Sequence, residues 1–244
     1  MAGKKRLDVL LVDTGLATDI TQSRALIGAG QVLVNTRTDY KAGSLLPVDS
    51  EFIVKQKSLF VSRAGEKLEG GLKGLAIDPS GWICADIGCS TGGFTDCLLQ
   101  RGACRVYSVD VGYGLLDWKL RKDERVVVLE RTNGRYLSRE QIPESLDFAV
   151  IDASFISLQQ LLHPLLPLFG SQVRIMALVK PQFELPREKV GQGGVVRENL
   201  LHEEAVSMVK EFGKEAGLAC RGEVASPVRG AKGNQEFLLY FTST

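Results

Sequence analysis

The sequence predicts an α/β protein in which a mostly parallel sheet is covered by helices on both faces. From residue 81 onward, short apolar runs alternate with segments of helical periodicity, as in parallel strands joined by crossover helices. The last two apolar runs are joined by a short segment, which predicts an antiparallel final strand. The 244 residues suffice for this domain and a smaller one before it.

The beginning of the chain predicts a small, basic α+β module. The spacing of apolar residues predicts helices over 6–16 and 21–27, and alternation predicts strands over 31–35 and 52–54. Residues 1–64 contain nine basic and six acidic residues, whereas the rest of the chain contains 21 and 23. The module therefore suits an anionic partner, although its charges could also serve only solubility. Its basic residues include Lys5, Arg6, Arg24, Arg37, Lys41, Lys55 and Lys57, with Arg63 at its end.

Changes in composition divide the chain into three parts. We assign residues 1–61 to the module, 62–70 to a linker and 71–244 to the α/β domain. In that domain, apolar runs predict seven strands, of which the last is antiparallel: 82–87, 105–109, 126–129, 147–152, 173–179, 218–226 and 236–241.

The most informative segment is the glycine-rich turn after the first of these strands. It has the order Asp-x-Gly-x-x-x-Gly-Gly, which does not match the G-x-G-x-x-G spacing of dinucleotide-binding loops. With an acid two residues before the first glycine, it resembles motif I of S-adenosylmethionine-dependent methyltransferases. An ordinary strand-to-helix turn is the alternative. The expected cofactor-binding residues here are Asp86, Gly88, Thr91, Gly92, Gly93 and Phe94.

Polar residues also stand at the ends of the other strands, where ligands of open α/β sheets bind. Asp110 follows the second strand and could bind ribose hydroxyls, or it could simply cap a turn. Asn133 lies in a candidate adenine-side loop, although Asn-Gly is also a common turn. Asp152 and Lys180 end adjacent strands, and burying either charge alone would be costly, so we expect them to pair. This pair could serve catalysis or only structure, and we also count Asp152 among the expected cofactor-binding residues.

Four segments extend these observations to a family. They are Asp152-Ala-Ser-Phe-Ile-Ser157, Val179-Lys-Pro-Gln-Phe-Glu184, Gly191-Gln-Gly-Gly-Val195 and Ser226-Pro-Val-Arg-Gly-Ala-Lys-Gly-Asn-Gln-Glu236. Together with the basic module, they resemble the TlyA family of ribosomal RNA ribose methyltransferases, whose catalytic domain is similar to FtsJ-like enzymes. The resemblance implies a Rossmann-like methyltransferase fold, S-adenosylmethionine as cofactor and a catalytic tetrad, here Lys67, Asp152, Lys180 and Glu236.

The resemblance also implies the acceptor. The module resembles the αL RNA-binding motif of a small-subunit ribosomal protein and pseudouridine synthases, on the residues Arg6-Leu-Asp8, Ser23-Arg-Ala-Leu-Ile27 and Gly30-Gln-Val-Leu-Val-Asn35. It implies RNA contacts by Lys5, Arg6, Arg24 and Arg63. The expected reaction is methyl transfer to a ribose 2′-hydroxyl of a ribosomal RNA cytidine, with neutral Lys180 as base. The short chain ends resemble the subtype that acts on the large subunit.

Two other function classes stay open at this point. One is a noncatalytic RNA-binding protein of the ribosome, and the other is a haemolysin or cytolysin, because TlyA-like proteins have also been described as haemolysins. We find no signal peptide and no apolar run near the roughly 20 residues that span a bilayer, which speaks against pore formation. The five cysteines form no C-x-x-C motif, so we expect no metal site and a cytoplasmic location.

Overall fold

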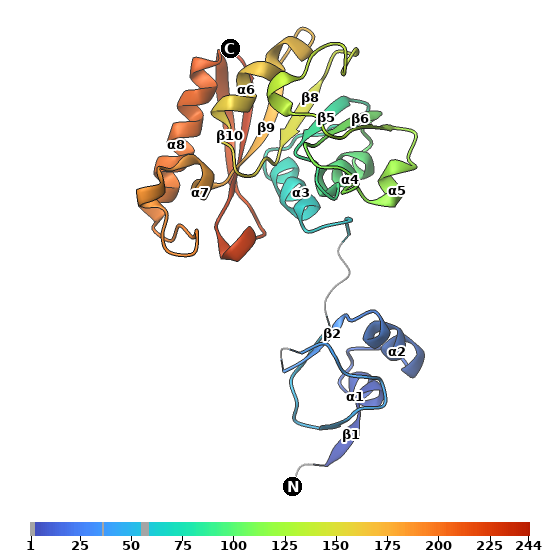
Figure 1. The fold of residues 1–244 in the computed structure, drawn as a ribbon. Helices are drawn as coiled ribbons and strands as arrows, with labels where there is room; N and C mark the ends of the chain where they lie inside the picture. Colours follow the sequence, from blue (N-terminus) through green and yellow to red (C-terminus); the bar gives the residue numbers. More distant parts are fainter. Residues whose placement is uncertain (1–2, 36, 55–58) are drawn as a thin grey trace. The chain divides into compact units, whose positions relative to one another are not determined.

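The computed structural model describes residues 3–35, 37–54 and 59–244 and divides the chain into two compact units, residues 1–57 and 58–244 (Figure 1). Lys55 and Lys57, two of the predicted basic residues of the module, lie outside the described residues. Each unit has its own hydrophobic core and is described separately.

The first unit is a small α+β fold with two short helices. Helix α1 (Leu7–Asp13) and helix α2 (Ile20–Gly28) pack together, and Asp19 caps α2 by accepting a hydrogen bond from the Gln22 backbone. Strand β2 (Val32–Val34) pairs with β4 (Phe52–Val54) in antiparallel fashion. These elements agree with the sequence-based prediction. The pairing of β1 (Lys4–Arg6) with β3 (Leu45–Pro47) was not predicted, because β1 consists only of basic residues and β3 ends in a proline.

The second unit is built around the predicted sheet. Among its described residues, seven strands lie in the order β10-β11-β9-β8-β5-β6-β7, and β11 runs antiparallel to both of its neighbours. The mostly parallel sheet with an antiparallel last strand is therefore confirmed. The strands are β5 (Ile83–Ile87), β6 (Arg105–Val109), β7 (Val126–Leu129), β8 (Phe148–Ile151), β9 (Arg174–Val179), β10 (Leu218–Ala225) and β11 (Phe237–Ser243).

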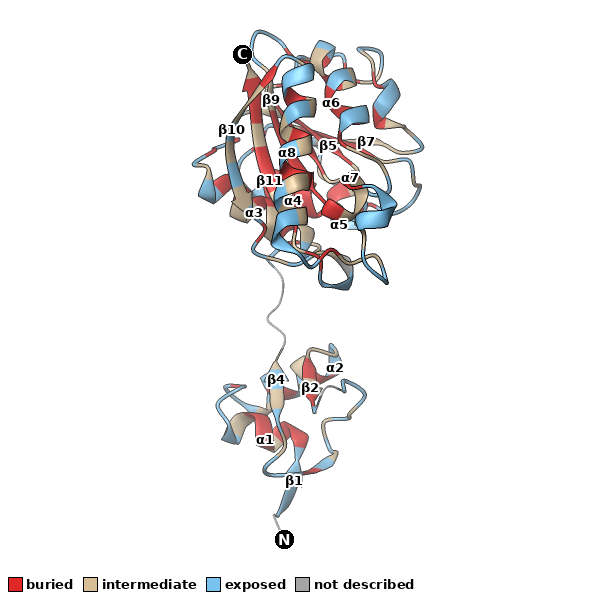
Figure 2. Ribbon diagram, turned by 90° about the vertical axis from the view of Figure 1, so that its left-hand side faces the viewer, coloured by how far each residue is buried: buried red, intermediate tan, exposed pale blue. Residues whose placement is uncertain are grey.

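Helices cover both faces of this sheet (Figure 2). Alternate strand residues contribute to two separate cores. On β8, for example, Phe148 and Val150 pack with the helices of one face, whereas Ala149 and Ile151 pack with those of the other. The first face carries α3 (Ala64–Gly74), α4 (Gly93–Gln100) and α5 (Trp118–Arg121). The second carries α6 (Gln159–Leu165), α7 (Pro181–Glu184) and α8 (Asn199–Glu215).

Residues 62–70, which the sequence assigned to a linker, belong instead to the second unit. Most of them form the first turns of α3, whose Leu68 and Leu72 are buried in the core beside α4. The change in composition suggested a joint, but the glycines of α3 allow close packing. A Cβ on Gly65 would lie 2.3 Å from the ring of Phe60, and one on Gly71 would lie 2.9 Å from the sulfur of Met176.

Four short 3₁₀ helices complete the described chain: Gly134–Tyr136, Leu166–Leu168, Arg187–Lys189 and Ala231–Gly233. The last lies in the joint between β10 and β11, for which the sequence predicted no helix.

Candidate active site

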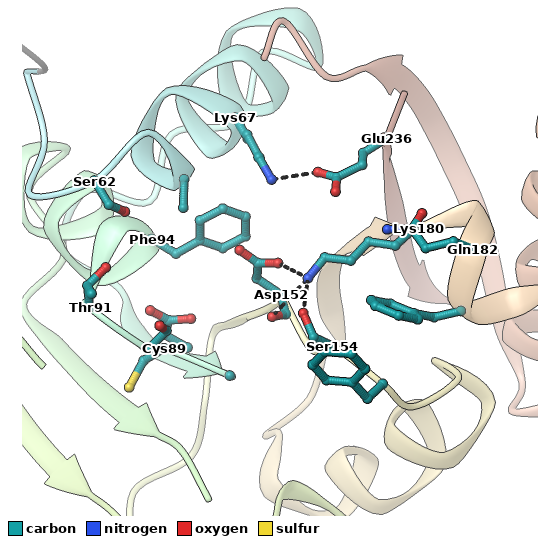
Figure 3. Close-up of a pocket in the computed structure, with 16 residues that line it drawn as sticks. Ser62, Lys67, Cys89, Thr91, Phe94, Asp152, Ser154, Lys180, Gln182 and Glu236 are labelled. Carbon is teal, nitrogen blue, oxygen red and sulfur yellow. Dashed lines mark hydrogen bonds and ion pairs between the residues drawn. The ribbon is translucent and has the colours of Figure 1, made fainter. Parts of the chain in front are cut away.

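A cavity of about 340 Å³ lies where the central parallel strands end, and all four predicted catalytic residues line it (Figure 3). It is lined from α3, the β5–α4 loop, the segments after β8 and β9, and the start of β11. The polar residues in its wall include Ser62, Lys67, Asp86, Ser90, Thr91, Asp152, Ser154, Lys180, Gln182 and Glu236.

Asp152 and Lys180 form the expected ion pair in this wall. Asp152 directly follows β8 and Lys180 directly follows β9, and these neighbouring parallel strands bring the two side chains together. Lys180 Nζ lies 2.6 Å from Asp152 Oδ1, although the angles of this contact are not those of a hydrogen bond. Lys180 also donates a hydrogen bond to Ser154 Oγ at 2.8 Å. The ammonium is thus held by two partners in a buried position.

Lys67 and Glu236 form a second pair across the same cavity. Their atoms Nζ and Oε2 lie 2.5 Å apart, and the Glu236 side chain is only 2% exposed. Lys67 comes from α3 and Glu236 immediately precedes β11, so 169 residues of sequence separate them. All four members of the predicted tetrad therefore lie around one cavity, in two acid–base pairs.

Asp86 lies at the base of the cavity and is fully buried. Its Oδ2 accepts hydrogen bonds from the backbone NH and the hydroxyl of Thr95, and that hydroxyl also contacts Ser108 Oγ at 2.8 Å. Burial raises the pKa of Asp86 to about 7, and nearby Asp152 adds to the rise while the Thr95 hydrogen bonds oppose it. Asp86 thus ties the end of β5 to the first turn of α4.

Unpartnered polar atoms are concentrated around this cavity. Within the described part of the chain, five buried side-chain oxygens lack a hydrogen-bond partner, and the residues that carry four of them line the cavity. These four are Ser62 Oγ, Asp86 Oδ1, Asp152 Oδ1 and Gln182 Oε1, of which Asp152 Oδ1 is ion-paired with Lys180 and the other three have neither a hydrogen bond nor an ion pair among the described residues. Burying polar atoms without partners is unfavourable, so their concentration here indicates a site shaped for a polar ligand.

The glycines of the loop serve packing within the chain as well as the approach of a ligand. Gly88 has φ +86°, and a Cβ there would lie 2.8 Å from the Asp152 carbonyl oxygen. Gly92 has φ +92°, and its Cβ would lie 2.3 Å from a Leu120 methyl group. A Cβ on Gly93 would lie 2.3 Å from Ser62 Oγ. The positive φ angles of Gly88 and Gly92 agree with the tight turn expected from the sequence, and the close contacts within the chain add a second reason for glycine at these positions.

A second cavity of about 640 Å³ adjoins the first, and Gly88, Ser90, Asp152, Ser154 and Phe155 line both. Its lining includes Asp110 and Asn133, the two residues predicted to contact the ribose and the adenine of the cofactor. Asp110 lies just after β6, but its oxygens accept backbone hydrogen bonds from Ser90 and Gly112 at 2.8 and 2.7 Å. Asn133 lies in the loop after β7, where its side-chain oxygen accepts from the Arg135 backbone at 3.1 Å. Both residues therefore also shape their loops.

The predicted RNA-binding residues do not share one unit. Lys5, Arg6 and Arg24 lie in the first unit, whereas Arg63 is an exposed residue at the start of α3 in the second. Arg6 and Arg24 both contact the carboxylate of Asp8, at 2.7 and 3.0 Å. The hydrogen bond from Arg6 is the main reason that the pKa of Asp8 is lowered. Lys5 pairs with Asp13 at 2.7 Å. The arginines are about half exposed and hence accessible.

Sequence reasoning missed several residues that complete the site. Ser154 holds Lys180, and Ser62 and Gln182 direct unpartnered oxygens to the cavity. Phe155 is 90% exposed with φ +65°, and its ring lies 5.0 Å from that of Phe183. An exposed aromatic residue in a left-handed conformation often marks a functional site. Ser154 and Phe155 follow Asp152 so closely that the strand-end rule could have included them.

The described residues were also searched for membrane-spanning helices and for metal sites. No helix among them is long and apolar enough to cross a membrane. The described side chains also contain no group of three or more histidines, cysteines, aspartates or glutamates arranged to hold a metal ion.

Comparisons with known proteins agree with this geometry. Residues 60–243 match the FtsJ-like methyltransferase family. The chain is 43% identical over 242 residues to the 16S/23S rRNA (cytidine-2′-O)-methyltransferase TlyA of Mycobacterium tuberculosis, covering 98% of this chain and 90% of that protein. It is 37% identical over 238 residues to Hemolysin A of Brachyspira hyodysenteriae, covering 97% and 99%.

A solved structure is similar over the whole length of the chain. It is that of a candidate hemolysin from Streptococcus thermophilus, with a TM-score of 0.76, 40% identity and coverage of 100% of this chain and 90% of that one. The family match covers three quarters of the sequence, including all four residues of the two acid–base pairs. The chain therefore belongs to the FtsJ-like methyltransferase family.

Proposed function

We propose that this protein transfers a methyl group from S-adenosylmethionine to the ribose 2′-hydroxyl of a cytidine in ribosomal RNA. The observation that carries the proposal is the placement of Asp152–Lys180 and Lys67–Glu236 around one buried cavity at the ends of the central strands. A noncatalytic RNA-binding protein would have no need to bury two such pairs, because unpaired surface lysines bind phosphates equally well.

The residues around the two cavities fit the cofactor. Asp86 Oδ1 is buried and unpartnered, which suits an ammonium donor, and the first turn of α4 beside it offers backbone NH groups to a carboxylate. Asp110 and Asn133 line the larger cavity, where a nucleoside would bind. When bound, S-adenosylmethionine supplies an electrophilic methyl group on a positively charged sulfur.

The chain's own residues then prepare the acceptor. Lys180, in its neutral form, accepts the proton of the ribose hydroxyl at Nζ. Nζ lies 2.6 Å from Asp152 Oδ1 and 2.8 Å from Ser154 Oγ. These two contacts fix its position, so that it stays within reach of the attacking oxygen. Lys67 and Glu236 form the opposite wall and orient the ribose.

Ribosomal RNA as the acceptor rests on the first unit and on the relatives. The first unit exposes the arginines that the αL resemblance implicates, and Asp8 holds two of them on one surface. Such side chains bind the RNA backbone and its shape more than its sequence. The similar protein of Mycobacterium tuberculosis is named for cytidine 2′-O-methylation of 16S and 23S rRNA. For this chain we propose the large subunit.

The test is to incubate the protein with labelled S-adenosylmethionine and each purified ribosomal subunit from cells that lack the modification. We expect label in RNA and a reverse-transcription stop at one cytidine when nucleotides are limiting. Label in the small subunit alone would contradict the subunit assignment. Absence of label in both subunits, with cofactor binding intact by calorimetry, would overturn the proposed function. Release of dye from liposomes by the protein would favour the cytolysin alternative.

A further inference from the structure

A third, smaller cavity lies directly beside the catalytic one. It has a volume of about 230 Å³ and shares Ser62, Ala64 and Lys67 with the catalytic cavity. Its remaining wall is formed by Arg63, at the start of α3, and by the segment Val228, Arg229 and Gly230, which leads toward Glu236. A ligand that enters the catalytic cavity could therefore extend into this one without leaving the surface.

The wall of this third cavity is basic. Arg63, Lys67 and Arg229 line it, and its lining contains no acidic residue. Arg63 and Arg229 are exposed, and no ion pair with a carboxylate is found for either among the described residues. Arg229 donates through Nη1 to the Gly233 carbonyl at 3.1 Å, which fixes the side chain and leaves its other donors available.

A buried polar atom at the boundary of the two cavities also lacks a partner. Ser62 Oγ is inaccessible to solvent and makes no hydrogen bond within the described residues, although Ser62 lines both cavities. Two exposed guanidinium groups beside a donor hydroxyl match an oxyanion with several acceptor oxygens. A phosphodiester has this chemistry.

We infer that Arg63 and Arg229 bind the backbone phosphate adjacent to the nucleotide that is methylated. This inference rests on the proposed function, because it assigns a subsite to the same RNA substrate. A ribose inside an RNA chain carries a phosphate on each side, whereas the lysines of the catalytic cavity are already paired with Asp152 and Glu236. The exposed arginines of the neighbouring basic cavity supply positive charge for one of these phosphates and set the position of the ribose along the chain.

The experiment measures steady-state methyl transfer to the purified ribosomal subunit that the wild-type protein labels, at several salt concentrations. We expect Arg229→Gln and Arg63→Gln each to raise KM for the RNA about tenfold while kcat changes less than about threefold. Each should also reduce the slope of log(kcat/KM) against log[salt] by roughly one. Cofactor affinity, measured by calorimetry, should stay within about twofold. Arg221→Gln is the matched control, because Arg221 is an exposed arginine of β10 that lines none of the three cavities.

The conservative variant Arg229→Lys separates charge from structure. Arg229→Lys should keep the salt slope of the wild type, because an ammonium still neutralises a phosphate. Its KM for the RNA should lie between those of the wild type and Arg229→Gln, because the ammonium lacks the bidentate geometry of the guanidinium. An unchanged KM and salt slope in both glutamine variants, with an active wild type, would overturn the phosphate subsite and leave the proposed function standing. A wild type that labels no RNA would instead remove the proposed function itself.

Discussion

Gly230 lies so close to Glu236 that a Cβ on the glycine would stand 1.8 Å from Glu236 Oε1. The loop between β10 and β11 therefore folds back against the carboxylate that pairs with Lys67. A backbone hydrogen bond from Gly230 to the Asn234 carbonyl, 2.8 Å long, holds the loop in this form. Glu236 is thus positioned by the absence of a side chain six residues earlier.

Gly230→Ala should reproduce the loss of Glu236. The added methyl group cannot coexist with the carboxylate, so Glu236 must turn away from Lys67, and we expect kcat for RNA methylation to fall about a hundredfold or more. The matched control is Gly233→Ala in the same loop, where a Cβ would meet nothing within 4 Å. Because Gly233 has φ +88°, this control should cost about 1–2 kcal/mol of stability but leave kcat within about threefold. Equal kcat values for the two variants would contradict this role of Gly230.

Replacing Lys180 should separate catalysis from cofactor binding. Lys180→Ala removes the proposed proton acceptor, and we expect methyl transfer to fall by about 10²–10⁴-fold, while cofactor affinity by calorimetry stays within a few-fold. Ser154→Ala is the graded comparison, because it removes only the 2.8 Å hydrogen bond that directs Nζ and should cost about tenfold or less. An active Lys180→Ala enzyme would exclude Lys180 as the base.

Asp86 should make both stability and cofactor affinity depend on pH. Its pKa is about 7 in the folded protein, against 3.8 for an unperturbed aspartate, so between these values the folded state holds a proton that the unfolded chain has released. The contribution of Asp86 to the free energy of unfolding therefore falls as pH rises from about 4 to 7. Affinity for the cofactor, whose ammonium favours the carboxylate, should rise through the same window.

The matched variant for this pH dependence is Asp86→Asn, which keeps an oxygen acceptor for Thr95 but cannot titrate. Urea unfolding and calorimetric cofactor binding at pH 5, 6, 7 and 8 measure the two effects. We expect flatter profiles for the variant in both measurements, together with weaker cofactor binding at pH 8. Parallel profiles for wild type and variant would show that another group controls the pH dependence.

Gly93 should be required for stability as well as for cofactor binding. A Cβ there would lie 2.8 Å from both the Ala64 Cβ and the Gly65 nitrogen, at the contact between the starts of α3 and α4. We expect Gly93→Ala to reduce the free energy of unfolding by about 1–3 kcal/mol and to weaken cofactor binding. Gly170→Ala is the control, because its Cβ would make only an ordinary 3.5 Å contact with Ser145. Thermal unfolding followed by calorimetry compares the two, and equal melting temperatures would contradict the packing role.

The sheet could be predicted from the sequence because its strands are short, apolar and separated by helical periodicity. The positions of Asp86, Asp110, Asp152 and Lys180 followed from the rule that ligands bind beyond the ends of parallel strands. The pairing of Asp152 with Lys180 could also be anticipated, since two opposite charges that follow adjacent buried strands have few other partners. Lys67 and Glu236 could be singled out only through the family resemblance, because each is an ordinary charge in its own segment.

What the sequence by itself determined is therefore the strand-end chemistry and the fold class, both of which depend on local patterns of apolar and polar residues. Tertiary structure decided the rest. It turned the supposed linker into helix α3, brought Lys67 to Glu236 across 169 residues, and placed Arg63 beside Arg229 around one cavity. The physical reason is that these contacts depend on close packing between segments far apart in the chain, as at Gly71, where the missing Cβ makes room for Met176 and Leu238, and no local periodicity encodes which side chains will meet.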